Sequence, residues 1–331
     1  MEVKVLVIGG TLFIGRVLVK ELVSSGHSVT VLHRKPKHDL GRHVGSIHAD
    51  RNDGAALRTA LAGNQFDVVF DNVYDWERGT TASQVGATVQ ACGDHLSRYV
   101  FMSSVAAYGD GLNHDEGDGL AAEDHLDAYV RNKANSERLL FRMHRLSGLP
   151  AVTLRPPFIY GPENPFYREA FFWDRLRDKR PIIVPGDGRR LMQFVHVADL
   201  VWCALRAMEN PAAVGQAFNV ANPKPLAQTE LIEVLAKAAK RPMPSLVPIP
   251  RERLLRAVGH PMGPKYYFAE YFDLPPITQF ISKAQRALKF KPVDFLEGLT
   301  ETYGWWAHAH PFPKPDYGFE DELIAKAPPD L

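Results

Sequence analysis

Short apolar runs alternate with helix-like segments over the first half of the chain. The runs are rich in β-branched residues and predict strands over 3–8, 28–32, 44–48, 66–71, 98–103 and 151–154. Amphipathic patterns between them predict helices over 14–24, 82–95 and 126–146. Strands that are apolar throughout and separated by helices indicate a parallel sheet with right-handed crossovers. The predicted fold is therefore α/β, a doubly wound parallel sheet of the Rossmann type.

The pattern changes after Arg155, where prolines interrupt the alternation and longer connections follow. We expect residues 1–155 to form a dinucleotide-binding domain to which some later segments return. Residues 156–331 should form mainly a smaller substrate lobe and a C-terminal tail. Because the tail is rich in proline and acidic residues, we expect it to be wrapped on the surface.

Composition excludes several classes of function. The chain has 331 residues, 45% of them hydrophobic, and its 39 Lys and Arg residues balance 38 Asp and Glu residues. This balance provides no broad attractive field for nucleic acid or anionic lipid. The two cysteines, Cys92 and Cys203, lack metal or redox spacing, and no apolar stretch is typical of a signal peptide or a membrane span. We therefore expect a cytoplasmic enzyme with a small-molecule substrate, and leave a homodimer open.

A glycine-rich turn follows the first strand and opens the first helix. Such a turn brings backbone N–H groups up to a pyrophosphate at a helix N-terminus. A plain strand–helix connection is the alternative, but the position after a buried strand favours the phosphate-binding interpretation. The candidate contacts in the turn are Gly9, Thr11, Leu12, Phe13, Ile14 and Gly15.

The end of the second strand indicates which dinucleotide binds. An acidic residue there favours NAD, whereas Arg34 stands at this place and can form charge-assisted bonds to a 2′-phosphate. We predict NADP, with NAD as the alternative cofactor. A solvated basic loop is the competing interpretation. Asp50 and Arg51 are well placed to border the adenine, and Asn72 is a further candidate contact.

A Tyr-x-x-x-Lys pair provides candidate acid–base chemistry. Tyr129 and Lys133 are four residues apart on a predicted helix, so both side chains lie on one face. A nearby ammonium stabilises the phenolate and brings a phenol, whose usual pKa is near 10, toward the working range. Ser103 and Ser104 end the fifth strand, at the sheet edge where ligands bind, and one hydroxyl can share the reacting oxygen.

These features together make the sequence resemble the extended short-chain dehydrogenases/reductases of the epimerase/dehydratase type. The resemblance covers nearly the whole chain. It includes the glycine turn, Ser104 with Tyr108-Gly109, and the Tyr129/Lys133 pair. It also includes the segments 155–162, 194–200, 218–220 and 283–288.

The resemblance implies roles for individual residues. By the family pattern, the catalytic hydroxyl belongs to Ser104, and Ser103 is structural. Lys133 also bonds the nicotinamide ribose, and the segment that contains Pro156 and Phe158 lines the nicotinamide.

Two departures from the family pattern bear on function. Leu12 replaces the middle glycine, as in a branch that includes the chloroplast stem-loop-binding proteins, some of which have lost the catalytic tyrosine. Met192 stands where many nucleotide-sugar enzymes have an arginine for the substrate phosphate, which puts a nucleotide sugar in doubt. Arg189 and Arg190 are near this position but displaced.

We therefore expect an NAD(P)-dependent oxidoreductase or epimerase that acts on a hydroxyl or carbonyl of a small polar molecule, with sugars included. The alternative is a nucleotide-sensing or RNA-associated binding protein on the same fold. Two further expectations concern residues to which we assign no catalytic or binding role. Asp199 should be the N-cap of the helix that follows it, and the acidic stretch 110–127 should be a mobile solvated loop.

Overall fold

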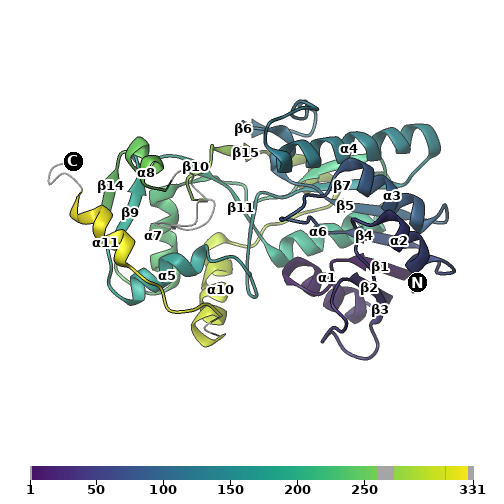
Figure 1. Cartoon of the computed structure of the whole chain (residues 1–331), viewed down its shortest axis with the longest axis horizontal. Helices are drawn as coiled ribbons and strands as arrows, with labels where there is room; N and C mark the ends of the chain where they lie inside the picture. The colour runs from purple at the N-terminus through teal and green to yellow at the C-terminus, as the bar shows by residue number, and fades with distance from the viewer. Residues whose placement is uncertain (1, 259–271, 310, 327–331) are drawn as a thin grey trace.

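The computed structural model describes residues 2–258, 272–309 and 311–326. Its largest sheet has seven strands and lies at the right of Figure 1. In spatial order its strands are β12 (Gln216–Asn219), β7 (Ala151–Arg155), β5 (Arg98–Met102), β4 (Val68–Asp71), β1 (Lys4–Ile8), β2 (Ser28–His33) and β3 (Gly45–His48). Every neighbouring pair is parallel, which confirms the predicted doubly wound sheet. The chain order reverses between β1 and β4, and ligands bind at such a switch point, beyond the carboxyl ends of the strands.

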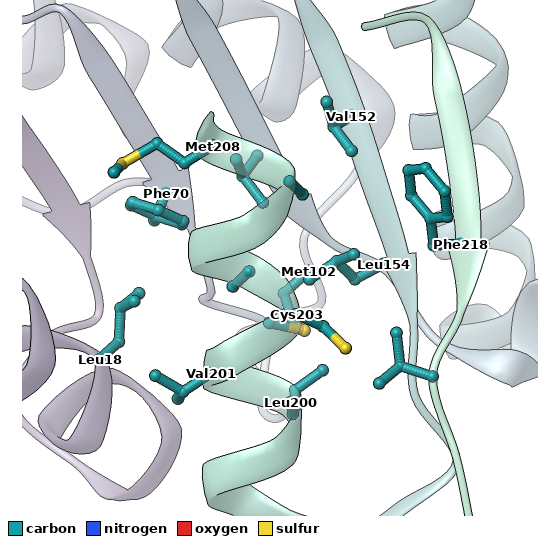
Figure 2. Close-up of a cluster of buried hydrophobic side chains, with 14 of the residues drawn as sticks. Leu18, Phe70, Met102, Val152, Leu154, Leu200, Val201, Cys203, Met208 and Phe218 are labelled. Carbon is teal, nitrogen blue, oxygen red and sulfur yellow. The ribbon is translucent and has the colours of Figure 1, made fainter. Parts of the chain in front are cut away.

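Helices cover both faces of the sheet. They are α1 (Phe13–Ser24), α2 (Gly54–Leu61), α3 (Ala82–Cys92), α4 (Ala128–Ser147) and α6 (Val197–Glu209). Successive residues of β1 point to opposite faces, so Val5 packs in one core cluster with α1 and α6, and Leu6 in another with α2, α3 and α4. Figure 2 shows the first cluster, in which Leu200 and Cys203 of α6 face the sheet.

A second body of packed elements lies beyond the sheet, at the left of Figure 1. Its larger elements are α5 (Glu169–Arg177), β9 (Ile182–Pro185), α7 (Gln228–Ala238), β14 (Leu246–Ile249), α8 (Arg251–Val258), α10 (Phe295–Ala309) and α11 (Gly318–Ala325). They share a third core cluster that includes Trp173, Leu235 and Trp306. The chain after Arg155 therefore contributes this body and also returns to the first one, where it adds strand β12 and helix α6.

Shorter elements complete the described fold. These are η1 (Val105–Tyr108), β6 (Gly111–His114), β8 (Phe158–Tyr160), β10 (Leu191–Met192), β11 (Phe194–His196), η2 (Pro211–Ala213), β13 (Leu226–Ala227), β15 (Ile277–Gln279) and α9 (Ser282–Ala287). Strand β6 pairs with β15, β8 with β11, β10 with β13, and β9 with β14.

Four segments differ from the sequence-based expectations. The short helix α2 was not predicted. The stretch 110–127 is not simply a solvated loop, because it contains β6, which is paired with β15. The tail is partly buried, since α11 packs Leu323 into the core and Glu320 forms a buried ion pair with Arg175. Asp199 is not an N-cap: α6 begins after His196, and the Asp199 carboxylate instead accepts a hydrogen bond from the backbone of Val293.

Candidate active site

A cleft of about 440 Å³ opens at the carboxyl edge of the sheet, beyond β1, β2, β4 and β5. This volume lies in the range of sites for small molecules and cofactors. Fourteen of the fifteen candidate residues line it: Gly9, Thr11, Leu12, Phe13, Ile14, Gly15, Arg34, Asp50, Arg51, Asn72, Ser104, Tyr129, Lys133 and Pro156. The exception is Phe158, whose ring packs against Phe194 with centroids 5.7 Å apart, and its contact with the cofactor stays a prediction.

The glycine turn has the close packing that a phosphate-binding loop needs. Gly9 has a φ of +83°, a conformation that favours glycine, and a Cβ on Gly15 would lie 2.0 Å from the Gly9 carbonyl oxygen. Leu12 is the N-cap of α1, and no side chain caps the helix there. Helix α1 therefore begins at the cleft without a side-chain cap on its first N–H groups, as a helix that binds a phosphate requires.

Asn72 offers a second group suited to a polar ligand. It lines the cleft directly after β4, and both its amide nitrogen and its amide oxygen are buried without a hydrogen-bond partner. Buried polar groups are normally hydrogen-bonded, so an unpaired amide beside a cleft calls for a ligand or water. Together with the open start of α1, the residues present fit a bound dinucleotide.

The cleft beside β2 is charged. Arg34 is largely exposed, and its guanidinium lies 3.2 Å from the Asp75 carboxylate. Arg78 bridges Asp75 and Asp50, with an Nη2–Oδ2 distance of 2.6 Å to each. Burial disfavours the charged form of Asp75, but hydrogen bonds from Arg78 and from the backbone of Glu77 lower its pKa below the usual value. Arg34 is thus held at the cleft by an acidic neighbour that the sequence analysis did not single out.

Arg51 lines the cleft floor, but its charge is directed into the protein. Its guanidinium pairs with Asp71 at the end of β4, and both side chains are almost fully buried. The Tyr99 hydroxyl donates to the same carboxylate at 2.7 Å. The Arg51 side chain therefore supports the floor of the cleft instead of reaching out beside Asp50.

Helix α4 positions Tyr129 and Lys133. Asp127 caps the helix by accepting hydrogen bonds from the N–H groups of Tyr129 and Val130, which fixes the first turn at the cleft. The Lys133 ammonium is buried, donates to the Met102 carbonyl at 2.6 Å and lies 5.8 Å from the centre of the Tyr129 ring. Burial lowers the pKa of Lys133 to about 8, although the Asp71 and Glu137 carboxylates favour its charged form.

The two serines after β5 have different surroundings. Ser103 is buried, and its hydroxyl donates to Glu137, which also pairs with Arg155. Ser104 lies at the start of η1, where its oxygen accepts a hydrogen bond from the Ala106 N–H at 3.2 Å. Only a weak local contact thus holds the Ser104 hydroxyl, whereas the Ser103 hydroxyl is part of a buried network.

Two aromatic residues beside Tyr129 were not predicted from the sequence. Trp76 stacks on the Tyr129 ring, with centroids 4.8 Å apart and planes inclined by 23°. The Tyr74 ring meets Tyr129 edge-on at 4.8 Å, and its hydroxyl accepts from Asn132 at 3.2 Å. Both residues follow β4 and line the cleft. Their position after a strand at the ligand edge was the signal that could have revealed them.

The side chains at and near Met192 lie outside the cleft. Met192 is buried in β10, and Arg190 donates to the Asp273 backbone at 2.8 Å and lies 3.5 Å from its carboxylate. Arg189 is almost fully exposed. Among the described residues, neither arginine lines the cleft. No helix in the described ranges is long and apolar enough to cross a membrane.

Comparisons with known proteins identify the family of the chain. The model of the NAD dependent epimerase/dehydratase family matches residues 5–221. The chloroplast stem-loop binding protein of 41 kDa b from Arabidopsis thaliana is 30% identical over 98% of this chain and 85% of its own length. A 2-alkyl-3-oxoalkanoate reductase from Stenotrophomonas maltophilia is 29% identical over 72% of this chain and 76% of its own.

Solved structures share the fold. A dTDP-glucose 4,6-dehydratase from Bacillus anthracis in complex with NAD superimposes with a TM-score of 0.76 at 16% identity, covering 95% of this chain and 99% of its own. An epimerase from Methanothermobacter thermautotrophicus gives a TM-score of 0.74 at 21% identity, covering 98% and 95%. The match of the family model over most of the chain decides the assignment. The chain belongs to the NAD-dependent epimerase/dehydratase family, the extended type of short-chain dehydrogenase/reductase, and is an NAD-dependent enzyme.

Proposed function

We propose that the protein is an oxidoreductase or epimerase that acts on a hydroxyl or carbonyl of a small polar molecule, with sugars included. One observation carries the proposal: Ser104, Tyr129 and Lys133 line the same cleft as the glycine turn. A Tyr-x-x-x-Lys pair alone occurs by chance on many helices. Its location beside a dinucleotide-type turn is what gives it a chemical meaning.

The bound dinucleotide supplies the hydride donor or acceptor. Tyr129 gives a proton to the substrate oxygen, or takes one from it, as the carbon centre is reduced or oxidised. The Ser104 hydroxyl hydrogen-bonds the same oxygen and orients it. The Lys133 ammonium stabilises the Tyr129 phenolate and holds the ribose, and its burial strengthens both electrostatic interactions.

The proposed cofactor is NADP, with NAD as the alternative. Arg34 supports this choice, because it stands at the end of β2 and its side chain is 61% exposed at the cleft. Lys35 lines the cleft beside it. Asp75 pairs with Arg34 and limits the preference for NADP over NAD. The 2′-phosphate has to compete with the Asp75 carboxylate for the Arg34 guanidinium.

Simple redox chemistry or epimerisation is favoured over dehydration. A dehydratase needs an acid close to the serine to remove a second proton. Here Ser104 is followed by Val105, Ala106 and Ala107 in η1, none of which can transfer a proton. The names of the relatives do not select a substrate: they include a UDP-glucose 4-epimerase and a 3beta-hydroxysteroid-dehydrogenase/decarboxylase besides the reductase above.

The direct test is Tyr129→Phe, which removes the hydroxyl and keeps the ring. Turnover of hydroxyl or carbonyl substrates with NADP should fall by about 10²–10⁴-fold, whereas dinucleotide affinity and melting temperature should stay near those of the wild type. A matched control is Tyr74→Phe, which removes the neighbouring hydroxyl from the same aromatic group. Equal losses in both variants, or undiminished turnover in Tyr129→Phe, would overturn the proposed role.

An RNA-associated binding protein is the second candidate, and the 30% identity to the chloroplast stem-loop binding protein favours it. The near-neutral net charge of +1 and the presence of Tyr129 argue against it. A gel-shift titration with a stem-loop RNA at 150 mM salt separates the two. Tight binding that survives Tyr129→Phe, together with no turnover by the wild type, would support the RNA-binding candidate.

A further inference from the structure

Trp76 is the feature of the cleft that the proposed chemistry leaves unexplained. Trp76 is 56% exposed although it lines the cleft. Its neighbours Tyr74 and Tyr129 are less exposed. Of the five tryptophans, which all lie in the described ranges, Trp76 is the exposed one. Leaving a large apolar ring in water is unfavourable, so exposure at a ligand site indicates a surface that a ligand covers.

Contacts with neighbouring aromatic rings fix the position of the indole. Trp76 stacks on Tyr129 at 4.8 Å and meets Tyr74 edge-on at 5.1 Å. Asp75, the residue before it, is fixed by hydrogen bonds to the N–H groups of Glu77 and Arg78 and to the Arg78 side chain. The turn that carries Trp76 is therefore built around a buried acid, and the indole is presented at a defined place beside the Tyr129 ring.

The cations nearest to Trp76 are engaged with protein groups, since Arg34 and Arg78 both pair with Asp75, the residue before Trp76. Arg34 and Lys35 follow β2, Arg51 is paired with Asp71 in the floor, and Lys133 is buried under the Tyr129 ring with its ammonium on a backbone carbonyl. The cleft that holds Trp76 and Ser104 is also lined by a group of apolar side chains: Leu12, Phe13, Pro156, Pro157, Ile159, Pro165 and Phe166. A diphosphate on the substrate would find no cation among them and would have to compete with Asp75 for Arg34 and Arg78.

We infer that Trp76 is a specificity-determining residue whose indole binds the apolar face of an uncharged ring that carries the reacting hydroxyl or carbonyl. A substrate whose oxygen reaches the Tyr129 hydroxyl extends its ring past the neighbouring indole. Ring faces lined by C–H groups pack well on an aromatic surface, because both are apolar and flat. The shared chemistry covers free pyranose sugars and carbocyclic alcohols or ketones, and it disfavours nucleoside-diphosphate sugars. This inference rests on the proposed function of the same site.

Binding without turnover provides the test. The Tyr129→Phe enzyme, saturated with NADP, is titrated with methyl α-D-glucopyranoside, cyclohexanol and UDP-glucose, and tryptophan fluorescence is recorded. The same titrations are done with Trp76→Ala and Trp76→Phe in this background. The difference between Tyr129→Phe and the Trp76→Phe variant isolates the emission of Trp76. Because the Trp76 ring is exposed, the fold should tolerate both substitutions, which equal melting temperatures would verify.

We expect at least one of the two ring compounds to change the Trp76 emission and to bind more tightly than UDP-glucose. Trp76→Ala should weaken that ring compound by about three- to tenfold, and Trp76→Phe should restore most of the loss. Which ring compound responds distinguishes a sugar from a carbocyclic substrate. The inference is overturned if neither ring compound changes the emission, if Trp76→Ala leaves their affinities unchanged, or if UDP-glucose binds most tightly.

Steady-state rates of variants that keep Tyr129 separate this inference from the proposed function. Trp76→Ala should raise KM for the responsive ring compound by the same three- to tenfold factor, with kcat changed much less. If no compound is turned over but Trp76-dependent binding persists, the proposed chemistry fails and the inference stands. If turnover depends on Tyr129 but KM does not depend on Trp76, the chemistry stands and the inference fails.

Discussion

The two ends of the cleft differ in the forces that they offer a ligand. Beside β2, Arg34, Asp75, Arg78 and Asp50 form a chain of ion pairs at the protein surface. Beside α4, the lining is aromatic and apolar around the Tyr129 ring, and Lys133, the cation found there in the described part of the chain, is buried. Charge at the first end can distinguish ligands by a phosphate group, whereas the second end distinguishes them by shape and apolar surface.

This difference assigns separate tasks to the two ends. An exposed ion pair exchanges partners at small cost, since solvent screens it. A buried ammonium has a strong effect on the groups around it, because the surroundings have a low dielectric constant. Mutations at the β2 end should therefore change which dinucleotide binds, and mutations at the α4 end should change the rate of the reaction.

The largest effect is expected for Lys133→Met, which keeps the apolar stem and removes the charge. Turnover should fall by about 10²–10⁴-fold, dinucleotide affinity should fall, and the rise of the rate with pH should move to higher pH. Each pH unit corresponds to about 1.4 kcal/mol of lost phenolate stabilisation. Pre-steady-state rates across pH 6–10 measure this. Weaker cofactor binding with an unmoved pH profile would show that Lys133 only positions the cofactor.

The same variant should become more stable near neutrality. Burial lowers the pKa of Lys133 to about 8, so the folded protein carries a cost for the buried charge below pH 8. That cost is relieved as the pH rises from 8 toward the pKa of the unfolded chain. The melting temperature of the cofactor-free Lys133→Met variant should therefore exceed that of the wild type more at pH 7 than at pH 10. Arg131→Met, which removes a cation outside the cleft, is the control.

Arg34→Ala should have the next largest effect, and on selectivity alone. Loss of a charge-assisted contact to a 2′-phosphate should weaken NADP by about 1.5–3 kcal/mol and leave NAD almost unchanged. Calorimetric titration with both dinucleotides measures the two affinities. Arg42→Ala, a nearby exposed arginine that does not line the cleft, should change neither. Equal affinities for NADP and NAD in the wild type, unchanged by Arg34→Ala, would contradict the cofactor assignment.

Asn72→Leu should weaken NADP and NAD by the same amount. The variant replaces an unpaired buried amide with an apolar group of similar size, so the free enzyme should be as stable as the wild type or more so. The lost hydrogen bonds to the dinucleotide should cost about 0.5–1.5 kcal/mol in affinity. Calorimetry on both ligands checks this, and an unchanged affinity would show that the Asn72 amide contacts neither.

The smallest effect is expected for Asp75→Asn, and it has the opposite sign to Arg34→Ala. The amide can still accept hydrogen bonds from the N–H groups of Glu77 and Arg78, so the turn should persist. Arg34 loses its acidic partner and becomes free for a 2′-phosphate. NADP affinity should rise by less than about 1 kcal/mol, because the pair is partly exposed. A fall in NADP affinity would mean that Asp75 positions Arg34 productively.

The sequence by itself determined the fold class and the order of its main elements. The predicted bounds of the first six sheet strands agree with the structure within two residues at each end. Helices were predicted less well, since the one over 82–95 ends three residues earlier and α2 was missed. The reason is that apolar periodicity and glycine turns are local signals, which fix strands and turns without knowledge of their partners. The short α2 buries only Leu57 and Leu61, too few positions for a clear helical period.

Only the tertiary structure decided which distant residues meet at the cleft. Trp76 and Tyr129 lie far apart in the chain and stack because β4 ends, and α4 begins, at the same sheet edge. The pairing of Arg51 with Asp71, the hydrogen bond of Asp199 with Val293 and the ring contact of Phe158 with Phe194 likewise depend on packing between segments. Side-chain direction and burial follow from the assembled layers, so a linear sequence contains no local signal for them.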